Sequence, residues 1–287
     1  MARVLLFGKD GQLGRALAPL LGRDHELIAV GRAEADFAEA DSYESGVRTA
    51  VRDVRPDVIV NAAAYTAVDR AEREPEQAMR VNAVSVGAMG EAAAEVGARV
   101  LHYSTDYVFD GAKAAPYIEQ DATGPLQIYG ESKLAGEDAL LGSGAQALIL
   151  RTSWVYSAGG TNFVQTMLRI GRERAQVRVV DDQVGAPTCV ADLAAATVEI
   201  LRKWSGERGI YHVTSAGSVS WAGFARAIFS QAAMAVDVLP IASAEYATAA
   251  RRPLNSRLDC ARVAAAFGIA LPEWQDGLRR VLAERNK

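Results

Sequence analysis

The feature that most limits the fold of this chain is a series of short apolar runs in its first half. They lie at residues 4–8, 25–30, 58–61, 99–104 and 147–151, and each is followed by a segment long enough to hold a helix. Strands that are apolar along nearly their whole length are typical of a parallel sheet covered by helices on both faces. The series therefore predicts a doubly wound α/β fold, with binding residues at the small or polar positions that end each run.

Beyond residue 155 the alternation becomes irregular. Three helices and one further strand are predicted there, at residues 163–171, 191–203, 221–233 and 209–213. Segments 181–187 and 246–257 mix charges, glycine and proline without a period, so we expect them to be functional loops.

This change in pattern predicts an unequal division of the chain. We expect residues 1–155 to form the domain of the main sheet and residues 156–287 to form mainly a smaller, interleaved C-terminal lobe. Residues from about 188 to 214 are expected to return to the main sheet. A length of 287 residues suits one large domain with such a lobe, and no repeat or linker marks a sharper boundary.

Composition excludes several classes of partner. The 31 basic and 35 acidic side chains give a net charge of -4, so no broad positive surface is available for nucleic acid. No apolar run approaches the length of a membrane span, and the N-terminal run is too short for a secretory signal. Cys189 and Cys260 are too far apart for a disulfide framework or a zinc motif. We therefore expect a cytoplasmic protein with no nucleic acid or membrane partner.

The three histidines of the chain are scattered. His25, His102 and His212 lack the spacing of metal ligands, so we expect packed or surface histidines and predict no metal site.

A glycine motif, GKDGQLG at residues 8–14, follows the first apolar run and leads into a periodic segment at 13–21. Its glycines permit a tight turn, a close approach of backbone N–H groups to a pyrophosphate, and close packing of the helix on the strand. We expect the dinucleotide to be bound by Gly8, Gly11, Gln12, Leu13 and Gly14. Strand, loop and helix occur in the required order, so the motif predicts an NAD(P)-binding domain of the Rossmann type. The alternative, a P-loop, is excluded because its G-x-x-x-x-G-K-[ST] pattern is absent from the sequence.

The end of the second run, Gly31-Arg32, bears on which dinucleotide binds. An acidic residue commonly occupies this position in NAD-binding units, whereas a guanidinium can pair with a 2′-phosphate. Arg32 therefore favours NADPH, with a solvated arginine as the alternative. Glu34 and Asp36 lie close enough to leave NADH use open, and Asp36 with Phe37 is assigned to the edge of the adenine.

Tyr129 and Lys133 are four residues apart, so on a helix they lie on one face, a turn apart. A neighbouring ammonium lowers the pKa of a tyrosine towards working pH, which makes its hydroxyl a usable general acid or base. Lys133 would also bind a ribose. Ser104, Thr105 and Asp106 end the fourth run, where hydroxyls can bind the carbonyl oxygen that receives the proton. We expect Thr105, Tyr129 and Lys133 to be catalytic, with a solvated helix face as the alternative for the Tyr–Lys spacing taken alone.

Together these features resemble the extended short-chain dehydrogenase/reductase family and, within it, the dTDP-4-dehydrorhamnose reductase family. The resemblance covers nearly the whole chain, through blocks at residues 8–14, 55–69, 103–109, 129–137, 151–156, 182–188 and 251–256. The last three blocks separate the chain from general nucleotide-sugar epimerases.

The resemblance implies that NADPH, or NADH, delivers hydride to C4 of dTDP-4-dehydro-L-rhamnose and that dTDP-L-rhamnose is formed. It implies that Tyr129 donates the proton, that Thr105 holds the carbonyl oxygen and that Lys133 tunes the tyrosine. In this family the dinucleotide also contacts the end of the third run, which here is Ala62, Ala63, Ala64, Tyr65 and Thr66.

The resemblance places the substrate against Thr105, Asp106 and Trp154, and we add Ser104. Trp154 offers a flat apolar face to a deoxysugar or a base, with a place in the core as the alternative. A forked guanidinium from Arg251 or Arg252 suits the diphosphate of a sugar nucleotide. Adjacent side chains on an extended segment point to opposite sides, so we assign Arg251, with Asn255, to the substrate and expect the other arginine to be solvated.

One departure from the family pattern concerns magnesium. Some members bind it at a dimer interface through a glutamate early in the helix after the glycine loop, where this chain has Gly14-Arg15-Ala16. The carboxylate that would bind magnesium is therefore missing, and we expect neither magnesium dependence nor that mode of dimerisation. A homodimer of another kind is still compatible with the sequence.

Two other functions are compatible with such a chain. A nucleotide-sugar epimerase or dehydratase also uses a tyrosine, a lysine and a glycine loop, but it retains NAD through its cycle. The regulatory subunit of eukaryotic methionine adenosyltransferase resembles this family and acts by binding a partner, so a reductase-like fold alone does not establish turnover. The joint presence of Thr105, Tyr129 and Lys133 argues against a purely binding role.

Overall fold

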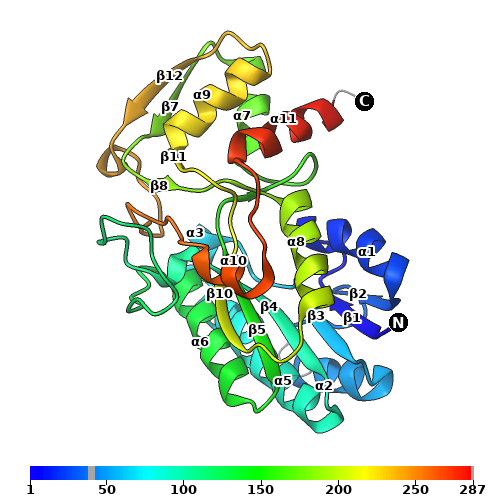
Figure 1. The fold of residues 1–287 in the computed structure, drawn as a ribbon. Coiled ribbons are helices and arrows are strands. Elements are labelled where there is room, and N and C mark those ends of the chain that lie inside the picture. Colours follow the sequence, from blue (N-terminus) through cyan, green and yellow to red (C-terminus); the bar gives the residue numbers. More distant parts are fainter. Residues whose placement is uncertain (38–42, 286–287) are drawn as a thin grey trace.

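The computed structural model describes residues 1–37 and 43–285 of the chain. Its largest element is a six-stranded sheet in the order β10-β5-β4-β3-β1-β2, in which all neighbouring strands are parallel (Figure 1). The strands are β1 (Arg3–Phe7), β2 (Glu26–Val30), β3 (Val58–Asn61), β4 (Arg99–Thr105), β5 (Gln146–Thr152) and β10 (Gly209–His212). The predicted doubly wound α/β class is confirmed. The first and last residues of each of these six strands lie within one residue of the predicted positions.

Helices cover both faces of this sheet because successive side chains of a strand point to opposite sides. Leu5 and Phe7 of β1 belong to one core cluster, with side chains of α2, α5 and α6. Val4 and Leu6 belong to the core on the other face, with side chains of α1, α8 and α10. The covering helices are α1 (Gln12–Asp24), α2 (Tyr43–Val54), α5 (Ser85–Val96), α6 (Ile128–Gly142), α8 (Val190–Lys203) and α10 (Ala261–Phe267).

The strand order reverses at β1, whose neighbours are β2 and β3. The helices that connect these strands, α1 and α2, lie on opposite faces because they belong to different core clusters. Doubly wound sheets bind ligands in the crevice that such a reversal opens beyond the carboxyl ends of the strands. Gly8 and Ala62, which follow β1 and β3, line a cavity at this edge.

A smaller lobe lies at one end of the main sheet, at the top of Figure 1. The parallel strands β7 and β12 pack there with α7, α9 and α11 around a separate apolar core. These elements are α7 (Phe163–Glu173), β7 (Gln176–Val180), α9 (Trp221–Gln231), β12 (Asp237–Ile241) and α11 (Trp274–Arg285). The three helices predicted in the second half are confirmed as α7, α8 and α9. The sequence analysis missed β7, whose exposed Gln176 and Arg178 interrupt the apolar pattern.

Several short elements lie between the longer helices and strands. They are α3 (Val68–Ala71), α4 (Pro75–Met79), β6 (Val155–Tyr156), β8 (Val184–Gly185), β9 (Thr188–Cys189) and β11 (Val219–Ser220). Strand β6 pairs with β9, and β8 pairs with β11, so segments distant in sequence meet where the two parts join. In the described part of the chain, every helix is too short or too polar to cross a bilayer.

Candidate active site

A cavity of about 270 Å³ lies at the carboxyl edge of β1 and β3. The predicted dinucleotide residues that line it are Gly8, Gly11, Gly31, Arg32, Asp36, Phe37, Ala62, Ala63 and Ala64. Phe7, Val30 and Val81 add apolar surface. A flat ring fits between such walls, whereas a phosphate fits against the glycine backbone.

The glycine loop owes its shape to close backbone contacts. Gly8 has a φ of +84°, and a Cβ atom on it would lie 2.6 Å from the amide nitrogen of Ala63. A Cβ atom on Gly14 would lie 2.0 Å from the carbonyl oxygen of Gly8. Helix α1 begins after Gly11 without a side-chain cap, so N–H groups of its first turn remain available to an anion. The loop and the cavity therefore fit a dinucleotide.

Arg32 lies at the rim of this cavity with 83% of its side chain exposed, and its Nε is 4.0 Å from Oδ1 of Asp36. The carboxylate of Glu34, the other acidic group near the motif, accepts a hydrogen bond from Gly31 N at 2.9 Å and pairs with Lys9. The charge of Glu34 is therefore offset, and the exposed guanidinium of Arg32 is long enough to reach a phosphate at the rim.

Other predicted cofactor residues use their polar groups within the protein. Oε1 of Gln12 accepts hydrogen bonds from Ser157 and Asn162, at 2.6 and 2.8 Å, and so ties α1 to the start of α7. The hydroxyl of Tyr65 donates to Glu74 and accepts from Arg70. Neither side chain lines the cavity. Gln12 is bound by partners far along the chain, whereas Tyr65 is bound by residues five and nine positions further on.

The two remaining residues of these motifs have little polar contact to offer. Leu13 packs against the apolar core beneath α1, and Thr66 is exposed. A dinucleotide contact through either residue stays a prediction.

Tyr129 and Thr105 meet at the carboxyl end of β4. Tyr129 is the second residue of α6, a helix whose N-cap Gln127 accepts a hydrogen bond from Gly130 N. Burial raises the pKa of Tyr129 to about 12, and a hydrogen bond with Thr105 opposes that rise. The expectation that Lys133 lowers this pKa is wrong for the arrangement seen, because burial dominates. Tyr129 is therefore protonated at neutral pH, as a proton donor must be.

Lys133 is buried, with 2% of the residue exposed. Its Nζ donates to the carbonyl oxygen of Tyr103 at 2.7 Å and lies 3.1 Å from Nε2 of His102. Burial lowers the pKa of Lys133 to about 8. The predicted one-face placement of Tyr129 and Lys133 on a helix is confirmed, but the lysine contacts His102 rather than the tyrosine hydroxyl.

Polar atoms with no hydrogen-bond partner among the described residues lie where β4 and β5 end. They are Oγ of Ser104, Oδ2 of Asp106, Oγ1 of Thr152 and Nε1 of Trp154, and all are buried. Buried polar groups in proteins nearly always have a hydrogen-bond partner, so a group of exceptions points to a ligand. Asp106 is the most telling of them: burial raises the pKa of its carboxyl to about 7, although hydrogen bonds from Ser256 and Thr105 act to lower it.

A larger cavity of about 990 Å³ lies between the main sheet and the smaller lobe. Arg251 is exposed and lines it, as does Arg252. The expectation that the second arginine is solvated is wrong, because Arg252 forms an ion pair with Asp69 at 2.6 Å and keeps 20% of its side chain exposed. This pair holds the pKa of Asp69 below its usual value. Arg251 is therefore the better placed of the two for an added phosphate.

Trp154 stacks face to face on Trp221, with ring centroids 3.5 Å apart and an angle of 6° between the ring planes. Its φ of +46° is unusual for a residue with a side chain, and such strain collects at functional sites. Trp221, not Trp154, lines the large cavity. Substrate contact through Trp154 therefore stays a prediction, and Trp221, the ring that lines the cavity, was not predicted.

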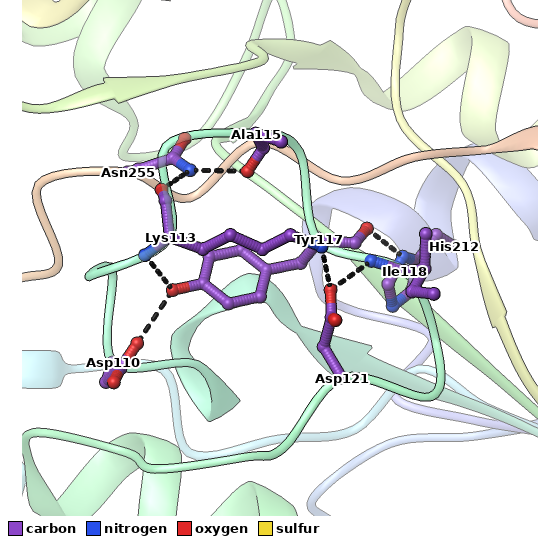
Figure 2. Close-up of polar contacts among 8 residues, drawn as sticks. All are labelled: Asp110, Lys113, Ala115, Tyr117, Ile118, Asp121, His212 and Asn255. Carbon is purple, nitrogen blue, oxygen red and sulfur yellow. Dashed lines mark hydrogen bonds and ion pairs between the residues drawn. The ribbon is translucent and has the colours of Figure 1, made fainter.

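Asn255 is engaged in shaping a loop (Figure 2). Its amide nitrogen donates to the carbonyl oxygens of Lys113 and Ala115, at 2.6 and 2.9 Å, and its Oδ1 accepts from Arg257. The same loop is held by the hydroxyl of Tyr117, which accepts from Lys113 N and donates to Asp110. With its amide committed in this way, substrate contact through Asn255 stays a prediction.

Comparisons with known proteins agree with this geometry. Residues 2–287 match the family model described as RmlD substrate binding domain. A dTDP-4-dehydrorhamnose reductase of Escherichia coli (strain K12) is 47% identical, over 98% of this chain and 97% of the relative. Another, from Sinorhizobium fredii (strain NBRC 101917 / NGR234), is 45% identical, over 98% and 96%. The chain belongs to the dTDP-4-dehydrorhamnose reductase family.

A solved structure bears on the cofactor of this dTDP-4-dehydrorhamnose reductase family member. The crystal structure of dTDP-4-dehydrorhamnose reductase from Bacillus anthracis str. Ames, in complex with NADP, matches with a TM-score of 0.93. It is 38% identical, and the match covers 99% of each chain. The predicted preference for NADPH agrees with that complex. For magnesium, the first turn of α1 contains no acidic residue that could serve as the ligand.

Sequence reasoning missed His102 in this family member. The residue is completely buried and lies in register with Asn61 of the neighbouring strand β3. Two polar residues side by side within otherwise apolar strands are a signal that the sequence did contain. The scattered spacing of the three histidines argues against a metal site, but it does not show which histidine lies beside a polar residue of the next strand.

The buried carboxyl of Asp106 predicts a pH-dependent cost to stability. Its folded pKa lies above its unfolded value of 3.8, so stability falls as pH rises through that interval towards about 7. Asp106→Asn is expected to raise the free energy of unfolding by about 2 kcal/mol at about pH 8 and to have little effect near pH 4. Urea unfolding at the two pH values measures this. Asp110→Asn is the control of opposite sign, because hydrogen bonds lower the pKa of Asp110. A gain that is equal at both pH values would contradict the assignment.

Proposed function

We propose that this chain reduces the C4 keto group of dTDP-4-dehydro-L-rhamnose with NADPH and forms dTDP-L-rhamnose. The observation that carries the proposal is the meeting of a protonated, half-buried Tyr129 with Thr105 at the edge of the sheet that also holds the glycine cavity. The names of the relatives, at 45 and 47% identity over nearly full length, support the choice of substrate.

The residues of the chain divide the work between binding and proton transfer. NADPH supplies the hydride. Tyr129 gives its proton to the new hydroxyl, and Thr105 holds the carbonyl oxygen while charge develops on it. The unpartnered groups of Ser104 and Asp106 supply hydrogen bonds to the sugar. The chain thus contributes position and electrostatics to a reaction whose redox chemistry belongs to the cofactor.

The large cavity is proposed to hold the nucleotide part of the substrate. Its volume of about 990 Å³ suits a sugar nucleotide rather than a free sugar. Trp221 and Phe163 offer aromatic surface, and Arg251 offers a cation for the diphosphate. Trp154 is proposed to support Trp221 from behind and to present its free edge to the sugar.

The division of the chain into functional parts is also a proposal. We assign dinucleotide binding to residues 1–155 and substrate binding mainly to residues 156–287, with about 188–214 returning to the main sheet. The expected location is the cytoplasm, which is in keeping with two free thiols, Cys189 and Cys260. A homodimer and the absence of a nucleic acid partner stay predictions.

One experiment separates this function from its alternatives. Purified protein is mixed with dTDP-4-dehydro-L-rhamnose and either NADPH or NADH, cofactor oxidation is followed by absorbance, and the product is identified by NMR. Stoichiometric oxidation with formation of dTDP-L-rhamnose is expected. Protein that keeps tightly bound NAD and consumes no added cofactor would indicate an epimerase or dehydratase. Binding of both ligands without turnover would indicate a binding subunit.

Cofactor choice is tested through Arg32. Arg32→Ala is expected to weaken NADPH binding about tenfold and NADH binding less than about twofold, because only NADPH carries a 2′-phosphate for the guanidinium. Dissociation constants from isothermal titration calorimetry measure the two effects. Arg23→Ala, in the last turn of α1, is the control for a lost surface charge. Equal losses for the two cofactors would remove Arg32 from the phosphate site.

A further inference from the structure

A continuous chain of hydrogen bonds connects the wall of the glycine cavity to Lys133. The amide N–H of Ala63, which lines that cavity, donates to Oδ1 of Asn61 at 3.1 Å. Nδ2 of Asn61 lies 3.0 Å from Nδ1 of His102, and Nε2 of His102 lies 3.1 Å from Nζ of Lys133. Nζ also donates to the carbonyl oxygen of Tyr103 at 2.7 Å.

The direction of each bond follows from the first. A backbone N–H can only donate, so Oδ1 of Asn61 is the acceptor and its amide nitrogen must donate to His102. Nδ1 of His102 then carries no proton, which places the proton of the neutral ring on Nε2. This N–H points at Nζ of Lys133, so the lysine must offer a lone pair. An ammonium at Lys133 would place one of its N–H donors opposite the N–H donor of His102, and no hydrogen bond could form between them.

We infer that His102 is a positioning residue that donates its Nε2–H to Lys133, and that the backbone of Ala63 fixes this tautomer and thereby stabilises the uncharged amine of Lys133 relative to its ammonium in the cofactor-free protein. A neutral amine has two N–H donors and one lone pair. One N–H donates to the carbonyl oxygen of Tyr103, and the lone pair accepts from Nε2–H of His102. The wall of the dinucleotide cavity thus shifts the equilibrium between the ammonium and the amine of the lysine. Any effect of that charge on turnover rests on the proposed function, whereas the tautomer of His102 is independent of it.

The surroundings of Lys133 favour the neutral form. His102, from β4, is completely buried, and this burial holds its pKa well below the usual value, so it adds no charge. Glu137, one turn on along α6, acts to raise the pKa of Lys133, but its carboxylate is bound by Arg151 of β5. Burial outweighs this attraction and brings the pKa of Lys133 to about 8. A donor bond from His102 stabilises the neutral amine further.

Nuclear magnetic resonance of the cofactor-free protein tests the tautomer directly. The chain has only three histidines, so ¹⁵N-histidine labelling gives three ring systems. We expect the Nε2–H tautomer for His102. His212 is a built-in control with the opposite expectation, because its Nδ1 lies 3.1 Å from the carbonyl oxygen of Tyr117 and must donate (Figure 2). A protonated Nδ1 on His102, or a charged ring, would overturn the inference whether or not the protein is a reductase.

A variant inverts the chain without removing the histidine. In Asn61→Asp the carboxylate can only accept, so the proton of His102 is expected to move to Nδ1, and Nε2 becomes an acceptor for a Lys133 ammonium. The ring signals should then resemble those of His212. Persistence of the Nε2–H tautomer in a folded Asn61→Asp protein would contradict the proposed direction of the chain.

The charge of Lys133 is measured by ¹³C-lysine labelling. The five lysines are Lys9, Lys113, Lys133, Lys203 and Lys287. The Lys133 signal, assigned by its loss in Lys133→Met, is expected to titrate at or below about pH 8, and His102→Phe is expected to raise that midpoint by about one pH unit. Tyr103→Phe is the matched control, because it removes a hydroxyl bonded to Thr197 and leaves the carbonyl in place. An unchanged midpoint in folded His102→Phe would overturn the inference.

Discussion

Replacing Tyr129 by phenylalanine is expected to lower kcat for reduction about 10³-fold, because general acid catalysis contributes on the order of 10² to 10⁴ and the variant loses only the proton donor. The dissociation constant for NADPH should stay within about twofold of the wild-type value, since the aromatic ring that remains fills the same volume. Single-turnover kinetics and calorimetry measure the two quantities. The ring of Tyr129 also packs edge-on against Tyr107, a contact that phenylalanine preserves.

The pH dependence of this loss distinguishes the arrangement seen from the one the sequence suggested. With a pKa near 12, Tyr129 stays protonated throughout the working range. The ratio of wild-type to variant rates is therefore expected to be constant from about pH 6 to about pH 9. A tyrosine whose pKa had been brought near neutrality would lose its proton, and the ratio would fall, as pH rises through that value.

A matched variant guards against a general effect of removing a buried hydroxyl. Tyr103→Phe, on β4, loses a hydrogen bond to Thr197 and is expected to change kcat less than about threefold. Near-normal turnover by Tyr129→Phe, or an equal loss in both variants, would rule out Tyr129 as the proton donor.

Local sequence signals account for most of the cofactor site. The glycine motif, the Gly31-Arg32 strand end and the alanines after β3 follow adjacent strands of one sheet, so a parallel topology is enough to bring them together. Backbone conformation at Gly8 and Gly14 depends on the absence of a side chain, which the sequence states directly. These contacts could be predicted because they depend on local backbone conformation and on the order of the strands rather than on side chains distant in the sequence.

Long-range partners account for what the sequence did not reveal. Arg252 was expected to be solvated, but Asp69, which binds it, is 183 positions away. Likewise Gln12 is taken up by Ser157 and Asn162, both more than 140 residues later. Such pairs depend on how the smaller lobe meets the sheet, and no periodicity or motif specifies that contact.

The network around Lys133 combines both cases. Its spacing from Tyr129 predicts that the two lie on one helix face, but the spacing does not show burial, which has the largest effect on the pKa of the tyrosine. Burial acts on Tyr129 and Lys133 in opposite directions, raising the pKa of the phenol and lowering that of the amine. The predicted interaction between the two groups is thus weaker than the effect of the core that encloses them.

The ion pair that fixes α6 to the sheet carries the largest expected effect on stability. Arg151 of β5 donates from Nε and Nη2 to the two carboxylate oxygens of Glu137, at 2.9 and 2.6 Å. The side chains are only 2% and 1% exposed. Glu137→Leu leaves the guanidinium buried without a counter-charge, and is expected to lower the free energy of unfolding by about 3 to 5 kcal/mol. Equilibrium urea unfolding measures the change.

Two further variants show whether the ion pair makes a net contribution to the free energy of unfolding or only compensates the cost of burying its own charges. Adding Arg151→Met to Glu137→Leu removes both charges and is expected to recover most of the loss, because separating a buried pair costs more than replacing it by apolar groups. Glu199→Gln, which breaks the exposed pair with Arg202, should cost less than about 1 kcal/mol. Recovery in the double variant would mean that the pair mainly orients α6, and with it Tyr129 and Lys133. A double variant no more stable than Glu137→Leu would instead assign Arg151 a packing role of its own, through its contact with the ring of Phe109.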